Sequence, residues 1–427
     1  MSRIGVALVG YGTIGSGVIE ILQNEQELIR KRTGLDIELL YVADKDLTTP
    51  RRVAVKSAKM VSDYREVLKD PDVNIVIELV GGVGFANTLV EDCLKSGKNV
   101  VTANKALLAE KGAPLFRLAK ENGLAIGFEA SVCGGIPIIR IITDALAGDR
   151  IHSIHGIVNG TTNYILTKMY EENLDFDTAL KQAQKLGFAE ADPTLDIGGG
   201  DAAHKITILA GIAFNTAVGY AQVSAEGITG IDLADVKNAR EFGYVLKLLA
   251  IAKCDPDGTV EVRVSPTLVP LDNQLANVRN EFNAVLINSE YLTNSMYFGR
   301  GAGSRPTASA VVADIVDIAK FKDAAHRTSK FIQFNEFPVK SMGEIESRYY
   351  VRFNVFDQPG VLSKISGIFG KYNISIASVI QEERSENDYV PLLMTTHSAK
   401  EKNMIAALDE IQKLDFCRQR GVLIRII

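Results

Sequence analysis

A chain of 427 residues is long enough to form two or three domains, each with its own hydrophobic core. Hydrophobic residues make up 46% of the chain and charged residues 23%, which is typical of a soluble globular protein. The net charge of −5 argues against a general affinity for nucleic acid or for acidic membranes.

The cysteines and the N-terminal residues indicate the compartment. Four cysteines lie far apart in the sequence without a CxxC pair, so we predict neither a disulfide framework nor a zinc site. The first residues, MSRIGVALVG, lead directly into a predicted strand and leave no room for a signal peptide. No apolar run reaches the roughly 18 residues that a membrane helix needs. We therefore expect a cytoplasmic protein.

The first third of the chain alternates strand and helix patterns. Amphipathic helical stretches at 13–32 and 87–98 separate short β-rich runs. These runs are 3–10, 36–44, 73–81, 98–104 and 124–131. The βαβα order predicts an α/β fold with a doubly wound parallel sheet, that is, a Rossmann-type dinucleotide-binding domain over residues 1–130.

Residues 131–303 show longer helices among alternating strands, which we interpret as a second α+β domain. The expected helices are 177–188, 201–214 and 235–254, and the expected strands are 258–269 and 283–291. A further helix at 306–321 is expected to return to the first domain as part of residues 304–334.

The rest of the chain is predicted to be an independent unit joined by a linker. Residues 335–347 break the periodicity and are interpreted as that linker. Residues 348–427 follow the order strand, helix, strand, strand, helix, strand, which predicts a small βαββαβ domain.

The stretch VGYGTIG places Gly10, Gly12 and Gly15 directly after the first strand and at the start of a helix. In this context Gly10 permits a tight turn, Gly12 lets the backbone approach a pyrophosphate, and Gly15 lets helix pack on strand. Free N–H groups at the helix N-terminus would bind the pyrophosphate. We predict a cofactor site that includes Thr13 and Ile14; the alternative is a plain glycine-rich turn.

Asp44, at the end of the second strand, bears on the choice of cofactor. A carboxylate here accepts hydrogen bonds from the ribose hydroxyls of NAD and repels the 2′-phosphate of NADP. Arg51, Arg52 and Lys56 follow closely and would attract that phosphate. The pattern favours NAD and leaves NADP open. The alternative is that Asp44 only begins a turn.

Lys105 stands just after another strand, in VVTANKALLA, where open α/β sheets bind their ligands. Most lysines are solvated surface groups, and that is the alternative for Lys105. The apolar residues on both sides of it favour a position at the edge of a cleft. We include Lys105 and Thr102, from the end of the same strand, in the predicted cofactor site.

Asp201 and Lys205 are one turn apart on a predicted helix that is apolar around most of its circumference. A buried ammonium group needs a partner, whereas the alternative is an exposed ion pair of small effect. Carboxylates in the preceding stretch suit a substrate that carries an ammonium group. These carboxylates are Glu190, Asp192 and Asp196. A lysine at the reacting oxygen suits the interconversion of an aldehyde and an alcohol, because it stabilises an alkoxide and delivers a proton.

The stretch NGTTNYIL, residues 159–166, offers hydroxyl and backbone donors before a helix. These donors would either hold a substrate carboxylate, with Thr161 among them, or only cap the helix. The five histidines show neither metal-ligand nor catalytic-triad spacing.

Together these motifs resemble the homoserine dehydrogenase family. Seven of them occur in that family's order over nearly all of residues 1–330: VGYGTIG, ELVGG, VVTANKALLA, EASVCGGIPII, NGTTNYIL, GFAEADPTLDIGGGDAAHK and GRGAGSRPTASAVVADI. The resemblance implies reversible NAD(P)-dependent oxidation of L-homoserine to L-aspartate 4-semialdehyde, in threonine, methionine and isoleucine biosynthesis. The alternatives are another NAD(P)-dependent oxidoreductase of a small amino acid, and a non-catalytic amino-acid sensor.

The resemblance also implies that residues 131–303 bind the substrate and form the dimer contact, and it implies roles for single residues. Lys205 would exchange a proton with the carbinol oxygen, and Lys105 would assist at the nicotinamide and the substrate. Gly187 and Gly303 would border the cofactor. The implied substrate residues are Glu190, Asp196, Asp201 and Thr161. A sodium ion would be held through backbone oxygens, which hard cations prefer. Its implied ligands are Glu129, Val132, Gly134 and Ile136.

Two positions depart from the family pattern. Many members carry an arginine just before the aspartate of the second strand, where it binds the NADP phosphate, but Ala43 stands here. Many also carry a glutamate in the segment that reads DIGGGD here, where Gly198 or Gly199 replaces it. The first departure weakens the case for NADP, and the second removes one secondary substrate contact.

The tail resembles an ACT domain, a small amino-acid-sensing module. Its stretch FDQPGVLSKISGIFGKYNISIASV contains the predicted effector residues Asp357, Pro359, Gly360 and Asn373. Family members with this tail are typically inhibited by threonine, which is therefore the expected effector. ACT units usually pair edge to edge, so we expect a homodimer or homotetramer. The alternative is an ACT-shaped dimerisation domain that binds nothing.

Overall fold

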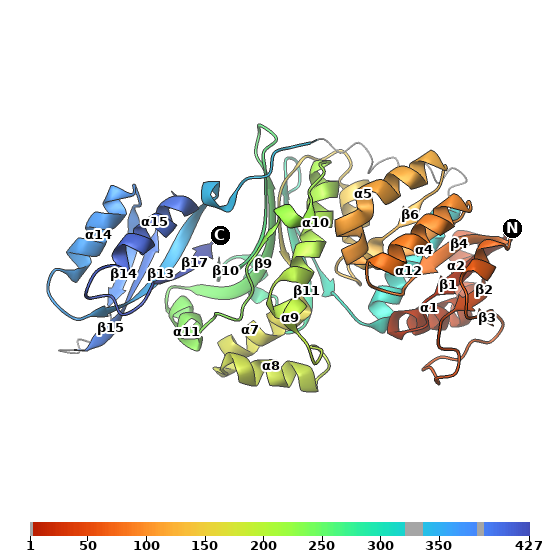
Figure 1. Ribbon diagram of the computed structural model, residues 1–427, viewed down its shortest axis with the longest axis horizontal. Helices are drawn as coiled ribbons and strands as arrows, with labels where there is room; N and C mark the ends of the chain where they lie inside the picture. The colour runs from red at the N-terminus through yellow and green to blue at the C-terminus, as the bar shows by residue number, and fades with distance from the viewer. Residues whose placement is uncertain (1–2, 321–335, 382–387) are drawn as a thin grey trace.

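The computed structural model describes residues 3–320, 336–381 and 388–427, and its N-terminal part folds around a six-stranded parallel sheet. In spatial order the strands are β3 (Lys59–Val61), β2 (Asp36–Ala43), β1 (Arg3–Val9), β4 (Val73–Glu78), β5 (Asn99–Thr102) and β6 (Ile126–Gly127). Consecutive residues of β1 enter different cores, Ala7 with the helices of one face and Leu8 with those of the other. The predicted doubly wound parallel sheet is confirmed (Figure 1).

Helices cover both faces of this sheet. The helices of the N-terminal part are α1 (Thr13–Asn24), α2 (Gln26–Thr33), α3 (Arg65–Leu68), α4 (Gly84–Lys95) and α5 (Lys105–Glu121). A sixth helix, α12 (Ser304–Lys320), packs on α1 so closely that a Cβ on Gly17 would lie 2.8 Å from the Ser304 carbonyl oxygen. The expected return of 304–334 can be followed through Lys320, and residues 321–334 lie outside the described residues.

A second, mixed sheet runs through the rest of the molecule. In spatial order its strands are β12 (Thr293–Arg300), β11 (Phe282–Ser289), β7 (Ile151–Ile157), β9 (Tyr244–Cys254), β10 (Val260–Pro270), β17 (Val422–Ile426), β13 (Glu346–Phe356), β15 (Tyr389–Thr396) and β14 (Ile376–Gln381). Two short strands, β8 (Ser224–Ala225) and β16 (Ala399–Lys400), pair with β10 and β13.

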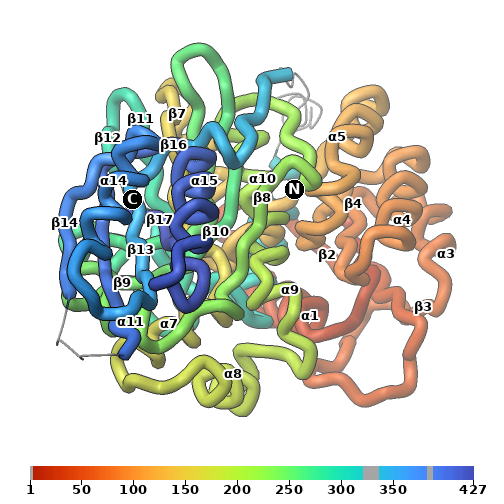
Figure 2. The backbone as a smooth tube through the Cα atoms, turned by 60° about the vertical axis from the view of Figure 1, so that its left-hand side comes forward, coloured from red at the N-terminus to blue at the C-terminus, as the bar shows by residue number. Residues whose placement is uncertain are grey.

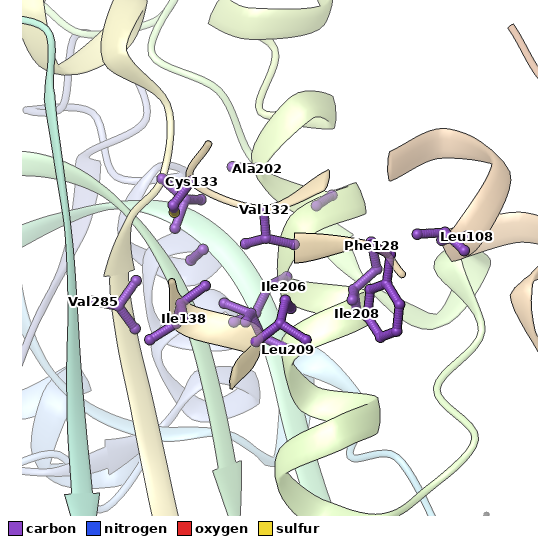
Figure 3. Packing of buried hydrophobic residues seen from close by; sticks show 14 of the residues in the cluster. Leu108, Phe128, Val132, Cys133, Ile138, Ala202, Ile206, Ile208, Leu209 and Val285 are labelled. Atoms are coloured by element: carbon purple, nitrogen blue, oxygen red, sulfur yellow. The ribbon is translucent and has the colours of Figure 1, made fainter. Parts of the chain in front are cut away.

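The helices of the central part join the two sheets. They are α6 (Ile138–Arg140), α7 (Gly160–Glu172), α8 (Phe176–Lys185), α9 (Thr194–Ile197), α10 (Gly200–Phe214) and α11 (Leu233–Glu241). Helix α10 is buried on nearly every side and lies between α5 and strands β9 and β10. Figure 3 shows Ile208 of α10 beside Phe128, with Leu108 of α5 close to both, and these residues belong to one apolar core.

The helix predicted at 235–254 is correct in its first half and wrong in its second half. Residues 235–254 form the end of α11 and then the strand β9, separated by Gly243 at φ +78°. The strand Tyr244–Cys254 is buried on both faces, so its leucines and alanines show no alternation with polar residues. Without that alternation the stretch looks helical, because periodicity cannot separate a buried strand from a buried helix.

The C-terminal unit has the predicted βαββαβ order but is not independent. Its helices are α14 (Val361–Lys371) and α15 (Glu401–Ile411). Strand β17 pairs with β13 on one side and in parallel with β10 on the other, so one sheet continues from the central part into the tail (Figure 2). This pairing satisfies backbone groups that a free strand edge would leave exposed.

The predicted linker is also fastened to the sheet. The Val260 N–H donates to the Pro338 carbonyl at 2.9 Å, and the Lys340 N–H donates to the Val260 carbonyl at 2.8 Å. Within the described ranges, no helix combines the length and the apolar character needed to cross a bilayer.

Candidate active site

The glycine turn after β1 has the geometry of a nucleotide site. Gly10 has φ +106°, and a Cβ there would lie 2.6 Å from the backbone of Leu79. A Cβ on Gly15 would lie 2.3 Å from the Gly10 carbonyl oxygen, so α1 touches the turn directly. A Cβ on Gly12, by contrast, would meet no atom within 4 Å. The turn therefore needs Gly10 and Gly15 for its shape, and at Gly12 it has open space in front of the start of α1.

Asp44 lies beside this turn, at the end of β2. Its Oδ2 accepts from the Tyr11 N–H at 2.6 Å, and its Oδ1 accepts from the Asp46 N–H at 2.9 Å. Arg51 approaches the same carboxylate, with Nη2 3.8 Å from Oδ1, and its guanidinium lies 5.7 Å from the centre of the Tyr11 ring. A group that reaches Asp44 from the turn would therefore also meet Arg51.

A cavity of about 440 Å³ opens between the turn and the ends of the strands. Gly10, Gly12 and Asp44 line one part of it, and Leu79, Val80 and Gly81 line another. Its position beyond the carboxyl ends of parallel strands is where open α/β sheets bind nucleotides. At the other side of the turn, the Ser304 hydroxyl donates to the Thr13 carbonyl at 2.7 Å, which brings the neighbouring Gly303 close to the start of α1.

Thr102 and Lys105 follow β5 but lie in different environments. The Thr102 hydroxyl is buried, donates to Glu78 Oε2 at 2.5 Å and accepts from the Asn104 N–H at 3.0 Å. This hydroxyl holds the loop in place, and its hydrogen bonds are used within the protein. Asn104 then caps α5, and Lys105 begins that helix with 32% of its side chain exposed.

Asp201 binds both lysines that the sequence singled out. Its Oδ2 accepts from Lys205 Nζ at 2.7 Å, and its Oδ1 lies 3.2 Å from Lys105 Nζ. Lys205 also donates to the Val158 carbonyl at 2.7 Å. An ammonium group has three N–H donors, so two described partners leave Lys205 one donor for a further acceptor.

Asn159 connects this cluster to Asp196. Its amide nitrogen donates to Asp201 Oδ2 at 2.8 Å and to Asp196 Oδ1 at 2.7 Å, and its amide oxygen caps α7 by accepting from the Thr162 N–H. Thr161 donates to the Phe188 carbonyl at 2.6 Å and lies 3.2 Å from Asp196 Oδ2. The two carboxylates and the start of α7 therefore form one network.

The charges of this cluster are set by burial and by each other. Burial alone would raise the pKa of Asp201, but Lys205 and Lys105 outweigh it and hold that pKa below its usual range. Burial would lower the pKa of Lys205, yet the Asp201 carboxylate outweighs that effect and the pKa is raised. Burial and the charge of Asp201 raise the pKa of Asp196. Lys205 is thus a buried ammonium, suited to hold negative charge on an oxygen and to give it a proton.

Two predicted site residues lie apart from this cluster. Glu190 is exposed in the segment after α8, and its backbone carbonyl accepts from Gln184 Nε2 at 3.2 Å. Gly187, at φ +75°, is exposed at the start of the same segment. Within the described ranges, no contact joins the Glu190 carboxylate to Lys205. The structure brings together Lys105, Asp196, Asp201 and Lys205, and leaves the role of Glu190 as a prediction.

The predicted sodium ligands lie in a tight turn. Cys133 has φ +54° and Gly134 φ +30°, and the Gly135 N–H donates to the Arg300 carbonyl at 3.0 Å. The Glu129 carboxylate is already engaged, because it accepts from the Ile139 N–H at 2.8 Å and the Arg140 N–H at 2.9 Å. The described residues contain no cluster of three acidic, histidine or cysteine side chains that fits a metal ion. A cation here would depend on backbone oxygens, as the prediction requires.

Three of the four predicted effector residues share a cavity, and the fourth lies elsewhere. Asp357, Pro359 and Gly360 line a cavity of about 410 Å³ beside Gln381, and Asp357 Oδ2 is buried there without a partner in the described part of the chain. Asn373 follows the opposite end of α14, at φ +57°. That helix of 11 residues is about 16 Å long, so Asn373 is not part of this cavity and instead ends the helix.

Sequence reasoning missed two residues that organise the site. Asn159 binds both Asp196 and Asp201, and Glu78 accepts from Thr102 Oγ1 and from the Val80 N–H at 2.9 Å. An asparagine directly before a helix start was a visible signal for Asn159. A single acid at the end of an apolar strand was the signal for Glu78.

Three family models match the chain. One is described as homoserine dehydrogenase and matches residues 137–316, and one is described as the NAD binding domain of homoserine dehydrogenase and matches residues 10–129. The third is the ACT domain, over residues 349–416. The homoserine dehydrogenase of Neisseria gonorrhoeae is 41% identical over 432 residues, which covers 100% of this chain and 99% of that protein.

Solved structures agree with these matches. The homoserine dehydrogenase of Thiobacillus denitrificans superposes with a TM-score of 0.94 at 39% identity, covering 100% of this chain and 99% of that one. A hyperthermophilic archaeal homoserine dehydrogenase, solved in complex with NADPH, gives a TM-score of 0.63 at 27% identity, covering 76% of this chain and 100% of that one.

Alanine substitutions at Gly12 and Gly10 should affect different properties: the first should weaken cofactor binding, and the second should lower stability. Gly12→Ala should fold with a loss of about 1 kcal/mol or less, because the new Cβ enters open space. It should weaken cofactor binding by about tenfold or more, since the methyl group occupies the approach of the pyrophosphate. Gly10→Ala should lower the melting temperature, because its φ is positive and Leu79 is too close. Thermal unfolding measures the change in stability, and cofactor titration measures the change in affinity. Normal cofactor affinity in Gly12→Ala would contradict the placement of the pyrophosphate at this turn.

Proposed function

The chain belongs to the homoserine dehydrogenase family, and on that premise we propose that Lys205, Asp201 and Lys105 carry its reaction. The chain is thus an oxidoreductase, and the two other classes considered from the sequence, a different amino-acid oxidoreductase and a non-catalytic sensor, are set aside. The observation that supports the proposal is the buried amine of Lys205, held at 2.7 Å by Asp201.

Lys205 gives a proton to the reacting oxygen in one direction of the reaction and takes it back in the other. Its remaining N–H donor points to a role at the carbonyl oxygen of aspartate 4-semialdehyde, where an ammonium stabilises developing negative charge and then gives its proton. In the direction of homoserine oxidation the same amine takes the proton from the hydroxyl group. The nicotinamide cofactor, when bound, supplies the hydride donor or acceptor.

Asp201 holds the two lysines in place. Without its carboxylate, Lys205 would be an uncompensated buried charge, which is strongly unfavourable. Because Lys105 begins a helix of the cofactor sheet and Lys205 belongs to the central part, Asp201 also keeps the Lys205 amine near the cofactor side. Lys105, which is partly exposed, is the group that reaches the nicotinamide and the substrate.

Acidic residues at the entrance suit the amino group of homoserine. Asp196 is half-buried in the Asn159 network, and Glu190 lies in the segment that follows α8. We assign these two carboxylates and that of Asp201 to the substrate ammonium, with Thr161 supporting Asp196 at 3.2 Å. Closure of the segment with Glu190 over the substrate would complete this site.

For the cofactor we propose NAD as the preferred form, with NADP also accepted. Gly10, Gly12, Thr13, Ile14 and Gly15 form the pyrophosphate turn, and Asp44 supplies acceptors for the ribose hydroxyls. Arg51, beside Asp44, is a cation that would pair with a 2′-phosphate. Gly187 and Gly303 are assigned to the border of this site.

Three further features belong to the same proposal. A sodium ion bound by the oxygens of the turn at Val132 and Gly134 would stabilise the link between the two sheets. The exposed Leu292 and Phe298, at the free edge formed by β12, favour a homodimer or homotetramer. Four free cysteines are consistent with a cytoplasmic enzyme.

Threonine is the proposed effector of the C-terminal ACT domain. The cavity at Asp357 combines a buried carboxylate oxygen, which suits an ammonium group, with the N-terminal end of α14 after Gly360, which suits a carboxylate. An amino acid carries both groups. Because β17 pairs with β10, deletion of the tail would expose a buried strand, so single substitutions are the better test.

Lys205→Ala should lower kcat by about 10²- to 10⁴-fold, because the proton donor and the oxyanion contact are both lost. The dissociation constant of NADH should change by about threefold or less. Lys247→Met is the matched control, since Lys247 is another buried amine but bonds to Asn163 and Val278. This control should lose stability and keep its kcat. Steady-state rates with L-homoserine measure the kcat of both variants. Near-normal turnover in Lys205→Ala would show that Lys205 is not part of the mechanism.

Asp44→Asn should reduce kcat/KM with NAD by about tenfold to hundredfold, because a charged acceptor for the ribose hydroxyls is lost. The amide oxygen can still accept from the Tyr11 N–H, whereas the Asp46 N–H loses its acceptor, so any loss common to both cofactors is ascribed to the loop. With NADP the same substitution should have little effect or should increase kcat/KM, since repulsion of the phosphate is removed. Equal losses with both cofactors would show that Asp44 does not select between them.

Asp357→Asn should raise the threonine concentration for half-inhibition by about tenfold or more, because the ammonium group loses its charged partner. The rate without threonine should stay unchanged. Glu410→Gln, on the exposed side of α15 where it pairs with Lys371, is the control and should respond normally. A wild-type enzyme that threonine does not inhibit would show that the effector is another molecule.

A further inference from the structure

One short segment, residues 226–228, touches both the C-terminal unit and the turn that precedes α10. It follows β8, which pairs with β10, and the Glu226 N–H donates to the Val264 carbonyl at 2.9 Å. Figure 2 shows β8 beside α10, with β10 and α15 nearby. The segment therefore lies between the tail and the carboxylates of Asp196 and Asp201, which are assigned to the substrate.

On the tail side, Glu226 forms an ion pair with the strand β17. Arg425 Nη1 lies 2.6 Å from Glu226 Oε2, and only 9% of the Arg425 side chain is exposed. The same guanidinium binds Glu401, the first residue of α15, at 2.5 and 3.0 Å. Tyr349 of β13 donates to Glu401 at 2.8 Å. Glu226 is thus joined to a buried charge network inside the ACT domain.

On the other side, the segment packs against the turn after α9. The Ile228 N–H donates to the Ile197 carbonyl at 2.8 Å. A Cβ on Gly227 would lie 2.1 Å from that carbonyl oxygen and 2.6 Å from Gly198 Cα, so the two backbones are in direct contact. The Glu226 carbonyl oxygen lies 3.4 Å from where a Cβ on Gly199 would be.

This turn determines where two substrate-binding side chains, Asp196 and Asp201, lie. Asp196 directly precedes Ile197, and Asp201 follows the turn in the first turn of α10. Gly199, at φ +86°, is the N-cap of α10. Because the contact is backbone on backbone, a movement of Glu226 shifts the turn and is not absorbed by side-chain rotation.

We propose that Glu226 is a positioning residue, through which strand β17 of the ACT domain sets the placement of Asp196 and Asp201 and hence the affinity for homoserine. The inference rests on the proposed assignment of these carboxylates to the substrate. A change in the ACT domain would reach them through Arg425, Glu226 and the turn, in one continuous set of contacts.

A second ion pair between the tail and the central part provides a control, although its Asp235 carboxylate is buried whereas the Glu226 side chain is 53% exposed. Arg352 of β13 binds both oxygens of Asp235 on α11, at 2.7 and 2.9 Å. This pair also joins the ACT domain to the central part, but α11 packs on β9 and α7. Asp235→Asn thus removes a charge from the same interface without touching the segment 226–228.

The experiment compares Glu226→Gln and Asp235→Asn in the full-length enzyme. Glu226→Gln should raise the homoserine KM by about threefold to tenfold, with kcat within about twofold of wild type. It should also increase hydrogen exchange in a peptide that covers residues 194–203, and it should weaken threonine inhibition by about fivefold or more. Asp235→Asn should leave the KM and the exchange of that peptide unchanged. Glu226→Asp, which keeps the charge, should recover part of the wild-type KM.

The outcomes separate this inference from the proposed function. An unchanged KM or unchanged exchange in Glu226→Gln overturns the positioning role, and so does an equal effect in Asp235→Asn. Asp201→Asn tests the assignment itself, because a normal homoserine KM in that variant means that the substrate lies elsewhere. If threonine does not inhibit the wild-type enzyme, only the proposal that threonine is the effector is wrong. The homoserine KM and the hydrogen exchange of the peptide then still decide the role of Glu226.

Discussion

The structure depends on keeping one ammonium group charged in a place that water hardly reaches. Only 11% of the Lys205 side chain is exposed, and a cation so placed is stable only beside an anion and a carbonyl oxygen. Asp201 and Val158 supply these partners. Asp201 in turn needs Asn159, so α10 and the start of α7 must meet at one point. The buried apolar sides of α10 hold them there.

This constraint also explains why the proposed active site lies between two sheets. Lys105 begins a helix that follows a strand of the cofactor sheet, whereas Lys205 and Asp201 belong to a helix that packs on the mixed sheet. A carboxylate with one lysine on each oxygen is a contact between the cofactor-binding part and the substrate-binding part. In the proposed function, hydride passes between molecules held by these two parts, so the ion cluster proposed to carry the chemistry would also set their distance.

The contacts among Lys105, Asp201 and Lys205 were easier to predict from the sequence than the fold of the second sheet. Glycine spacing at Gly10 and Gly15 and the i,i+4 pair of Asp201 and Lys205 are local signals, and local geometry is what a sequence displays. The strand β9 was taken for a helix because both of its faces are buried. The pairing of β17 with β10 joins residues more than 150 positions apart, and no periodic pattern encodes such a contact. Asn373 came from family resemblance, which says nothing of where the residue lies in this structure. Glu190 came from the run of carboxylates before α10, and that run does not tell which of its side chains reaches Lys205.

The place of β17 inside the mixed sheet has a consequence for how the protein is made. Of all the strands in that sheet, β17 is the last to leave the ribosome, yet it lies between β10 and β13. Until it arrives, one edge of β13 and the part of β10 at Thr267 and Leu268 are open to water and to other chains. The first sheet can close early during translation, apart from the contribution of α12, whereas the mixed sheet cannot. Nascent chains of this enzyme therefore pass through a stage in which chaperone protection of β10 and β13 matters most.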